Sequence, residues 1–539
     1  MGLAPGSWPN SDTLLLVTAA DARAGDRYAM ANGDAPEALM WRAAGHLVRH
    51  IIAPARSGYG LRVVIVAGKG NNGGDGFTAA LRLTREQGAH VVVVALDGVD
   101  VALSREAEAY RSQWLTQGGQ VITDVTAAKT AIRRAHVVVD AILGTGASGP
   151  LRGLAAVAVG LLAFAKSAGV HLVACDLPTG VDADSGAVAP NTVKADRTIT
   201  FGAVKRGHML APGASYCGEV TVASLGHHWD RFLHNLGSDP AQPPFTALTG
   251  RGACPAPYAP EDDKWSRGRV AVIGGVTGMA GAASLAAMGA LTAGAGLVSV
   301  YASDAVAAEI AGHVDASVMV RRVALADTAP SGLVTAAWLE TADLGVHADV
   351  IVAGPGFGVA PEVAATVKVL LASAARLVLD ADALNVFRHD PHALQAHAGQ
   401  LVLTPHRKEL ARIGGGVDGD DAWANRVTRV PTLAQKLNAT IVAKGPATLI
   451  AAPDGRVWVT PVGSAAAGTG GSGDLLSGII AAAVARADDV PLAVAQAVWW
   501  HALAAQHAGE RAHGRATAES LRTELPHVFH ALATGSTTL

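Results

Sequence analysis

The sequence has little of several features that would place a protein in a special class. It has only three cysteines among 539 residues, Cys175, Cys217 and Cys254, and such an odd, widely spaced set forms neither a disulfide framework nor a zinc-binding pattern. No apolar run approaches the ~18 residues that a membrane-spanning helix needs, and the N-terminus lacks the pattern of a signal peptide. The net charge is −3 without a basic block, which argues against nucleic-acid binding. We therefore expect a cytoplasmic protein that binds neither membrane nor nucleic acid.

The composition favours a two-domain α/β protein. The chain is 50% hydrophobic, contains 62 glycines and has only 4% aromatic residues, which suits tight loops and close packing of helices on sheets. A chain of 539 residues is too long for one hydrophobic core, because domains usually have ~100–200 residues. We expect two large domains.

Strand and helix signals alternate in both halves, which predicts parallel sheets with helical crossovers. The first half carries apolar runs typical of buried strands at 61–67, 90–96, 136–139, 171–174, 197–201 and 219–223. The second half carries them at 269–273, 297–301, 350–353, 377–379, 401–403, 440–443, 448–451 and 457–460. Between the two series lies a stretch rich in Pro, His, Asp and Gly. We predict a Rossmann-like three-layer sandwich over residues 1–226, a linker over 227–263 and a second α/β domain over 264–539.

The most informative motif is residues 468–474, Gly-Thr-Gly-Gly-Ser-Gly-Asp, which lead directly into an apolar stretch. A glycine-rich loop that opens a helix presents free backbone N–H groups at the positive end of the helix dipole, and such a loop suits phosphate. A carboxylate repels phosphate, so Asp474 needs another role. The obvious role is to take a proton from a hydroxyl as phosphoryl transfer begins. The motif thus predicts phosphate chemistry on a small alcohol.

In the first half, unusual polar residues follow successive predicted strands. The first strand leads into Gly-Lys-Gly-Asn-Asn-Gly-Gly-Asp-Gly at 68–76, and two later strands end at Asp140 and Asp176. Ligands of open parallel sheets bind beyond the carboxyl ends of the strands, so we expect these groups to converge. Each aspartate could instead cap a helix and each glycine could serve a turn, but three such sites at successive strand ends argue against that alternative.

Four runs in this half carry a family resemblance: Asn71-Asn72-Gly73-Gly74-Asp75, the segments 140–146 and 176–180, and Lys205 within 201–207. Together they resemble the NAD(P)H-hydrate epimerase domain over roughly residues 14–225. The resemblance implies a potassium ion held by Asn72, Asp140 and Thr179, and we infer that Asp176 or Asp140 shuttles the proton; the sequence does not choose between them. The implied contacts to the hydrated nucleotide are Asn71, Asn72, Gly73, Gly74, Asp75, Gly144, Thr145, Gly146, Gly149 and Asp176.

The second half carries another resemblance. Its glycine loop resembles the anion hole of ribokinase-like kinases, and the segments 264–275, 290–300, 354–358, 380–385, 404–406 and 444–448 resemble, in order, the ADP- or ATP-dependent NAD(P)H-hydrate dehydratase. A ribokinase-like α/β fold is implied. Asp474 would activate the ring hydroxyl, and Asp380, Asp382 and Asn385 could position Mg²⁺ or phosphate. The implied substrate contacts are Gly356, His406 and Asp474, and the implied nucleotide contacts are Lys444, Gly445, Pro446, Ala447, Thr448, Gly470, Gly471 and Gly473.

Together the two resemblances imply a fused, bifunctional repair enzyme for hydrated NADH and NADPH. One half would interconvert the R and S epimers, and the other would phosphorylate the ring hydroxyl of the S form so that it leaves. A ribokinase-like kinase of a vitamin-type alcohol, with an accessory N-terminal domain, is the main alternative, and a non-enzymatic binding role for the N-terminal half is another. The resemblance also suggests a homo-oligomer. The sequence does not decide between ADP and ATP.

Overall fold

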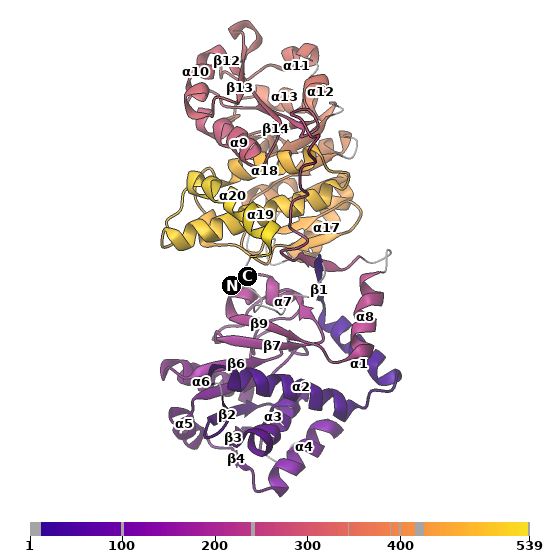
Figure 1. Cartoon of the computed structure of the whole chain (residues 1–539), viewed down its shortest axis with the longest axis vertical. Coiled ribbons are helices and arrows are strands. Elements are labelled where there is room, and N and C mark those ends of the chain that lie inside the picture. Colours follow the sequence, from indigo (N-terminus) through magenta and orange to yellow (C-terminus); the bar gives the residue numbers. More distant parts are fainter. Residues whose placement is uncertain are drawn as a thin grey trace. The chain divides into compact units, whose positions relative to one another are not determined.

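The computed structural model describes residues 12–55, 57–98, 102–238, 243–342, 344–373, 375–388, 390–397, 400–414 and 425–536. The chain divides into two compact units, an N-terminal unit, Leu14–Phe245, and a C-terminal unit, Thr246–Thr538. Each unit is built around a sheet with helices packed against it (Figure 1). The prediction of two large α/β domains therefore agrees with the architecture.

The N-terminal unit contains a seven-stranded, fully parallel sheet in the order β4-β3-β2-β5-β6-β7-β9. A short parallel pair outside this sheet, β1 with β8, places Val17 beside Lys205. The elements are β1 (Thr13–Val17), α1 (Ala19–Ala31), α2 (Pro36–Ile52), β2 (Arg62–Ala67), α3 (Asn71–Gln87), β3 (His90–Val94), α4 (Arg105–Thr116), β4 (Gln120–Ile122), α5 (Val125–Arg133), β5 (Val137–Ala141), α6 (Gly153–Ser167), β6 (His171–Cys175), β7 (Arg197–Phe201), β8 (Val204–Lys205), α7 (Arg206–Met209), β9 (Glu219–Ala223) and α8 (His227–Gly237).

Helices cover both faces of this sheet, which explains why its strands are nearly continuous apolar runs. Alternate residues of a strand point to opposite faces: in β2, Val63 and Ile65 join a core with α1, α2, α3, α4 and α8, whereas Val64 and Val66 join a second core with α5 and α6. The arrangement is the predicted three-layer sandwich.

The C-terminal unit contains a larger sheet in the order β13-β12-β11-β14-β15-β16-β17-β18-β19. It is parallel up to β17 and antiparallel from β17 to β19, and Thr246 of β10 donates a hydrogen bond to Val457 of β19. The elements are β10 (Phe245–Leu248), β11 (Arg269–Ile273), α9 (Ala280–Thr292), β12 (Leu297–Ser303), α10 (Asp304–His313), β13 (Met319–Val323), α11 (Ala336–Ala342), α12 (Leu344–His347), β14 (Val350–Ala353), α13 (Glu362–Leu371), β15 (Arg376–Leu379), α14 (Asp382–Asn385), β16 (Leu401–Leu403), α15 (Arg407–Ile413), α17 (Arg426–Leu437), β17 (Ala439–Ala443), β18 (Leu449–Ala451), β19 (Val457–Val459), α18 (Ser472–Ala485), α19 (Val490–Arg511) and α20 (Ala518–Thr534).

Helix α18, which begins within the glycine loop, packs very closely against α9. A Cβ on Gly478 of α18 would lie 1.9 Å from the carbonyl oxygen of Ala286, and one on Gly289 of α9 would lie 2.3 Å from that of Leu475. Only glycine permits this backbone approach. The contact fixes α18, and therefore the position of the glycine loop at its start.

All fourteen predicted strands are present, but the structure differs from the expectations in two respects. The sequence analysis missed the short or half-exposed strands β1, β4, β8, β10 and β13. The range 227–263, expected to be a linker, contains helix α8 and strand β10. Helix α8 is held to the N-terminal unit by Trp229, which is 1% exposed and packs into its core; a burial of this kind leaves no signature in local composition.

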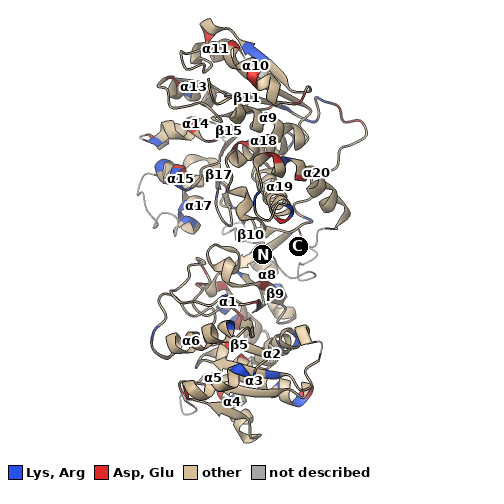
Figure 2. Ribbon diagram, turned by 90° about the vertical axis from the view of Figure 1, so that its left-hand side faces the viewer, with Lys and Arg blue, Asp and Glu red and all other residues tan. Residues whose placement is uncertain are grey.

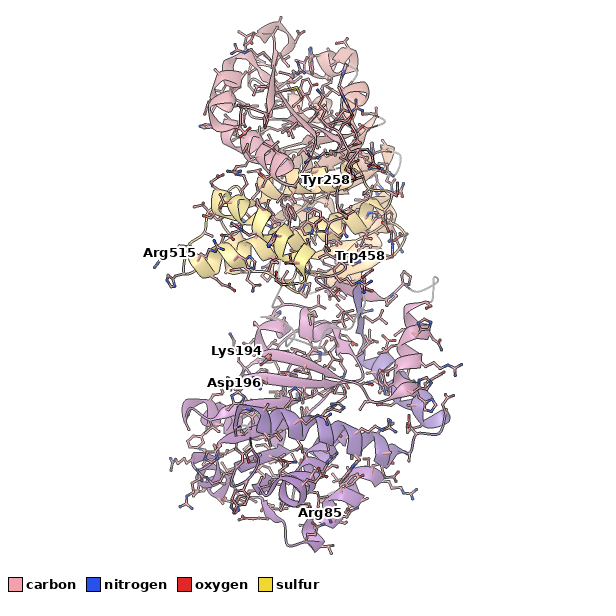
Figure 3. All side chains as sticks on the ribbon, in the orientation of Figure 1. Arg85, Lys194, Asp196, Tyr258, Trp458 and Arg515 are labelled. Atoms are coloured by element: carbon pink, nitrogen blue, oxygen red, sulfur yellow. The ribbon has the colours of Figure 1, made fainter. Side chains whose placement is uncertain are left out.

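Charged side chains of both signs are spread over the chain, in keeping with its small net charge of −3. Basic and acidic residues are interspersed over the ribbon in the view of Figure 2. Side chains pack around both sheets (Figure 3). Lys194 and Asp196, labelled at the side of the N-terminal unit, lie in the segment that immediately precedes β7. Among the described helices, none combines the length and apolar character needed to cross a bilayer.

Candidate functional site

Polar residues meet at the carboxyl ends of neighbouring parallel strands in the N-terminal unit. Strands β2, β5 and β6 are adjacent. Strand β2 leads into the loop 68–70, Asp140 is the penultimate residue of β5, and Asp176 directly follows β6. Asp176 has φ of +64°, a left-handed conformation that is costly for a residue with a side chain and often marks a functional site. The predicted convergence at this edge of the sheet is therefore present.

The Asp140 carboxylate is held by hydrogen bonds from the loop that follows β6. It accepts hydrogen bonds from the Thr179 backbone N–H at 2.8 Å and from the Thr179 hydroxyl at 2.7 Å, and a weaker one from Ile142 N–H at 3.3 Å. Burial raises the pKa of Asp140 to about 6, against the opposing effect of these hydrogen bonds. The side chain of Asn72 lies beside Gly144, in the same loop cluster.

The three residues predicted to hold potassium offer a suitable set of oxygens. One side-chain atom of Asn72, assigned as Nδ2, is buried without a partner among the described residues. Amide oxygen and nitrogen are assigned rather than observed, so a flipped amide would present an oxygen at this position. A carboxylate, a hydroxyl and an amide oxygen suit a hard cation. No cluster of three or more His, Cys, Asp and Glu side chains with metal-binding geometry occurs in the described part of the chain.

Asp176 is held by a buried lysine. Lys205 Nζ lies 2.6 Å from Asp176 Oδ1 and also donates to Thr200 Oγ1 and to the Phe201 carbonyl, both at 2.9 Å. Burial alone would raise the pKa of the Asp176 carboxyl, but the Lys205 ammonium holds it below its ordinary value. Asp176 is therefore ionised at neutral pH, although it lies in a buried site.

His208 binds the backbone of both members of the ion pair. Its Nδ1 accepts from the Lys205 backbone N–H at 3.0 Å, so its Nε2 carries the proton that it donates to the Asp176 carbonyl at 2.8 Å. Burial lowers the pKa of His208 to about 4, so the ring stays neutral. Its role is to fix the backbone of the ion pair.

A cavity of about 640 Å³ opens in front of Asp176 and Lys205. Of the residues predicted to contact substrate, it is lined by Asn71, Asn72, Asp75, Gly144, Thr145, Gly146 and Asp176. Gly73 and Gly74 do not line it; a Cβ on Gly73 would lie 1.8 Å from the Gly68 carbonyl oxygen, so Gly73 is required by the turn itself. Gly149 lines a second cavity of about 450 Å³ on the other side of the 144–150 loop.

The same geometry recurs in the C-terminal unit. Strands β14, β15, β16 and β17 are adjacent and parallel, so the segments that follow them share one edge of the sheet. These segments contain Gly354 to Gly356, Asp380, Thr404 to His406, and Lys444. Motifs that lie up to ninety residues apart in the sequence are thus brought together.

Lys444 and Asp380 form an ion pair against the glycine loop. Lys444 Nζ lies 2.6 Å from Asp380 Oδ1, and a Cβ on Gly473 would be only 3.2 Å from Lys444 Nζ and 3.8 Å from Asp380 Oδ2. Burial alone would lower the pKa of Lys444, but the carboxylates of Asp380, Glu409 and Asp474 raise it. A positive charge therefore lies at the glycine loop.

Asp474 lies in the first turn of α18, beside this ion pair. The loop has Gly471 in the left-handed conformation, φ +83°, as the residue that caps the helix. Burial and, after it, the negative charge of Asp380 raise the pKa of Asp474 to about 7, against the effect of Lys444. A carboxylate of this basicity is suited to accept a proton near neutral pH. No described residue forms an ion pair or a side-chain hydrogen bond with the Asp474 carboxylate, so it does not serve as a structural anchor.

His406 and Glu409 form a capping box at the start of α15. His406 Nδ1 accepts from the backbone N–H groups of Lys408 and Glu409, and Glu409 Oε2 accepts from the His406 backbone N–H at 2.8 Å. Burial raises the pKa of Glu409 to about 7, against the effect of Lys444, and burial lowers that of His406. His406 thus has a structural role in addition to any contact with substrate.

Two further predicted groups lie on the rim of this site. Asp382 Oδ2 accepts from the Gly358 backbone N–H at 2.9 Å, which links the loops after β14 and β15, and burial raises its pKa. The loop 445–448 is partly exposed and contains Ala447 with φ of +54°. A larger cavity of about 980 Å³ lies at the opposite, amino-terminal ends of the strands, beside Asp349 and Arg376, away from every predicted site residue.

Comparisons with known proteins match both units. Residues 36–207 match the family described as YjeF-related protein N-terminus, and residues 270–527 match the NAD(P)H-hydrate dehydratase family. A bifunctional NAD(P)H-hydrate repair enzyme from Moorella thermoacetica is 33% identical over 96% of this chain and 97% of its own. The chain belongs to this family of bifunctional NAD(P)H-hydrate repair enzymes. The corresponding enzyme from Coxiella burnetii is 32% identical over 93% of this chain and 96% of its own.

Among solved structures, the ADP/ATP-dependent NAD(P)H-hydrate dehydratase from Bacillus subtilis, co-crystallised with ATP and Mg²⁺, is 28% identical. It covers 53% of this chain and 97% of its own, with a TM-score of 0.44. The family matches and the near-full-length relatives confirm the family assignment expected from the sequence. The two sheets with their packed helices confirm the α/β fold class.

Several residues in the two sites of this repair enzyme were not among those predicted from the sequence. Asp26, Trp229 and His208 surround the N-terminal ion pair, and they lie outside the motifs. In the glycine loop, the Ser472 hydroxyl is 3.0 Å from Nε2 of His501 on α19, both buried. Burial lowers the pKa of His501 to about 4. Asp26, Trp229 and His501 reach the sites only through packing of elements that are distant in the sequence, whereas His208 directly follows the segment 201–207 and Ser472 lies within the glycine loop.

Proposed function

We propose that the enzyme repairs hydrated NADH and NADPH, with epimerisation in the N-terminal unit and nucleotide-dependent dehydration in the C-terminal unit. The observation that carries the proposal is the match to bifunctional repair enzymes over nearly the full length of both chains. The two sites support it, because each has the charges that its reaction requires.

The dehydration site can turn a poor leaving group into a good one. Hydroxide leaves an alcohol slowly, whereas a phosphorylated hydroxyl leaves readily. Asp474, with its pKa raised to about 7, takes the proton of the ring hydroxyl as it attacks the terminal phosphate of ADP or ATP. Backbone N–H groups of Gly470, Gly471 and Gly473 stabilise the migrating phosphoryl group, an effect worth about 3 kcal/mol per donor in other enzymes. Lys444 adds a fixed positive charge at the same place.

Groups suited to bind the nucleotide and Mg²⁺ surround this centre. The exposed loop 445–448 lies next to Lys444 and is the proposed contact for the nucleotide. Asp380, Asp382, Glu409 and Asp474 give four carboxyl groups against two cationic side chains, Lys444 and Arg412, an excess that fits a divalent cation. Mg²⁺ held by Asp380 and Asp382 would neutralise charge on the phosphates.

In the N-terminal unit we assign different roles to the two candidate aspartates. Asp140 is engaged by Thr179 and Ile142, and it would hold potassium together with Thr179 and Asn72. Asp176 lines the cavity, so it is the carboxylate at the reacting ring. The residues that line the cavity from the loops 71–75 and 144–146 would contact the hydrated nucleotide.

We also propose that the enzyme is a homo-oligomer.

The decisive experiment supplies hydrated NADH to the purified enzyme with ADP or ATP and follows the return of NADH absorbance. In a parallel sample without nucleotide, chromatography follows interconversion of the R and S epimers. We expect NADH to form only when a nucleotide is present, and the epimers to interconvert without it. Failure with both nucleotides, together with phosphorylation of an unrelated alcohol, would replace dehydration with a kinase function.

A further inference from the structure

Seven charged residues line the cavity of the N-terminal unit: Arg23, Asp26, Lys69, Asp75, Glu106, Asp176 and Lys205. Of these, Asp26, Asp176 and Lys205 are the charges that act on the Asp75 carboxyl. Asp26 comes from α1, Asp75 from the first turns of α3, Asp176 follows β6, and Lys205 lies on β8. All four line the cavity. Within this group of four, three carboxyl groups share one ammonium, which favours the neutral form of a buried carboxyl that has no cation bound to it.

The hydrogen bonds indicate which carboxyl stays ionised. Asp176 is bound by Lys205 at 2.6 Å and accepts from the Thr200 hydroxyl at 3.0 Å. Asp26 Oδ1 accepts from the indole N–H of Trp229 at 2.9 Å. The Asp75 carboxyl, in contrast, receives no hydrogen bond from any residue that the structure describes, and it is open to the cavity.

The position of Asp26 is fixed by close packing around Trp229. A Cβ on Gly25 would lie 2.6 Å from the indole ring, and one on Gly202 would lie 2.7 Å from it. The ring therefore fills the space between α1 and the end of β7, with its N–H directed to Asp26. This arrangement holds the Asp26 carboxyl at the cavity wall, where burial raises its pKa above the ordinary value.

The charges around Asp75 favour its protonated form. Burial and, after it, the carboxylates of Asp176 and Asp26 raise the pKa of Asp75 well above its ordinary value, and only Lys205 opposes them. The thiol of Cys175, on β6, is a further neighbour, and burial also raises its pKa, so it adds no charge near neutral pH. The pKa values of Asp75 and Asp176 are thus shifted in opposite directions within one cavity, the arrangement that separates an acid from a base.

We propose that Asp75 is the general acid of epimerisation and that Asp26 is a positioning residue that keeps the proton on it. This inference rests on the proposed epimerase function. It assigns the moving proton to Asp75, whereas Asp176, bound to Lys205, remains an anion throughout.

The reaction balances without any further reagent. In the hydrate, the carbon that bears the hydroxyl is bonded to the ring nitrogen. Asp75 donates its proton to the hydroxyl oxygen while the carbon–oxygen bond breaks, water leaves, and the nitrogen lone pair forms a carbon–nitrogen double bond. The resulting cation is stabilised by the Asp176 carboxylate. Water then adds to the opposite face of the ring and returns a proton to Asp75.

The first test measures epimer interconversion without nucleotide in the wild type and in Asp75→Asn, after subtraction of the spontaneous rate. Loss of a general acid costs about 10²–10⁴-fold in rate, and we expect a loss in this range. Glu86→Gln, which removes an exposed carboxylate from the same helix, is the matched control and should keep the wild-type rate. An Asp75→Asn rate within threefold of wild type would overturn the inference.

The second test is the pH profile of Asp26→Asn, which keeps an acceptor for the Trp229 N–H but removes the charge. Asp75 must be protonated to act, so the wild-type rate falls as pH rises through its pKa. Without the charge of Asp26 that pKa is lower, and the fall should move to lower pH by about one unit. An unmoved profile, or one moved upward, would contradict the role of Asp26. A wild-type enzyme without any acceleration would instead refute the epimerase function itself.

Discussion

Replacement of Asp474 by Asn tests the central step of dehydration. The substitution keeps the size and the polar character of the side chain but removes the base. General-base catalysis contributes about 10²–10⁴-fold, so kcat for nucleotide-dependent NADH formation should fall by that factor. Asp474 has no structural ion pair among the described residues, so the fold should be unchanged. The epimer interconversion of the same sample, measured without nucleotide, serves as the control.

The pH dependence makes this prediction specific. A base must be ionised to act, and burial raises the pKa of Asp474 to about 7. At saturating substrate the wild-type rate should therefore rise with pH up to about 7 and level off above it. The residual activity of Asp474→Asn should lack this rise.

Glu409 complicates the assignment because burial also raises its pKa to about 7, and interacting groups titrate as a pair. Glu409→Gln separates them. Glu409 accepts the His406 backbone N–H and lies 3.2 Å from His406 Nε2, so we expect it to support the capping box and not to act as the base. Its replacement removes a negative neighbour of Asp474, so the rise should persist and move to lower pH. If the rise disappears in Glu409→Gln but persists in Asp474→Asn, the proposed base is the wrong carboxylate.

Three further outcomes follow from the structure. Lys205→Met leaves the buried Asp176 carboxylate unpaired and should destabilise the N-terminal unit by about 3–5 kcal/mol, measured by denaturant unfolding; an unchanged midpoint would show that the ion pair does not stabilise the unit. Gly478→Ala places a Cβ against the Ala286 carbonyl oxygen and should cost the C-terminal unit about 1–3 kcal/mol in the same assay, whereas a neutral result would mean that α9 and α18 can separate. Exchange of K⁺ for tetramethylammonium should slow epimerisation but not dehydration. In Thr179→Val the epimerisation rate should no longer depend on which cation is present. Equal epimerisation rates of the wild type in both salts would argue against the cation site.

Asp176→Asn should slow interconversion of the epimers while nucleotide-dependent dehydration of the S form continues.

Lys205 holds the pKa of Asp176 below its ordinary value, so the Asp176–Lys205 pair contributes its stability above the pKa of an unfolded aspartate. That stability is lost only as pH falls through the lower, folded value. Thermal melting between pH 5 and 8 should therefore show no change that depends on Asp176.

Much of the fold could be predicted because the strands carry their own signal. Strands buried on both faces must be apolar at nearly every position, as β2 and β5 are, and such runs stand out in any sequence. Short strands with exposed positions, such as β4 and β13, lack that signal. Helix α8 was hidden because its one buried anchor, Trp229, is recognisable only when α1 and β7 are in place.

The chemistry of the sites was determined by the sequence only in part. A glycine loop followed by Asp474, and carboxylates at the ends of predicted strands, were sufficient to predict phosphate chemistry and a polar pocket, because loop geometry and strand direction are local properties. The protonation states were decided by the tertiary structure alone. They depend on which charges burial brings together, Lys205 with Asp176 and Lys444 with Asp380, and a charge in a buried site acts on neighbours that are distant in the sequence.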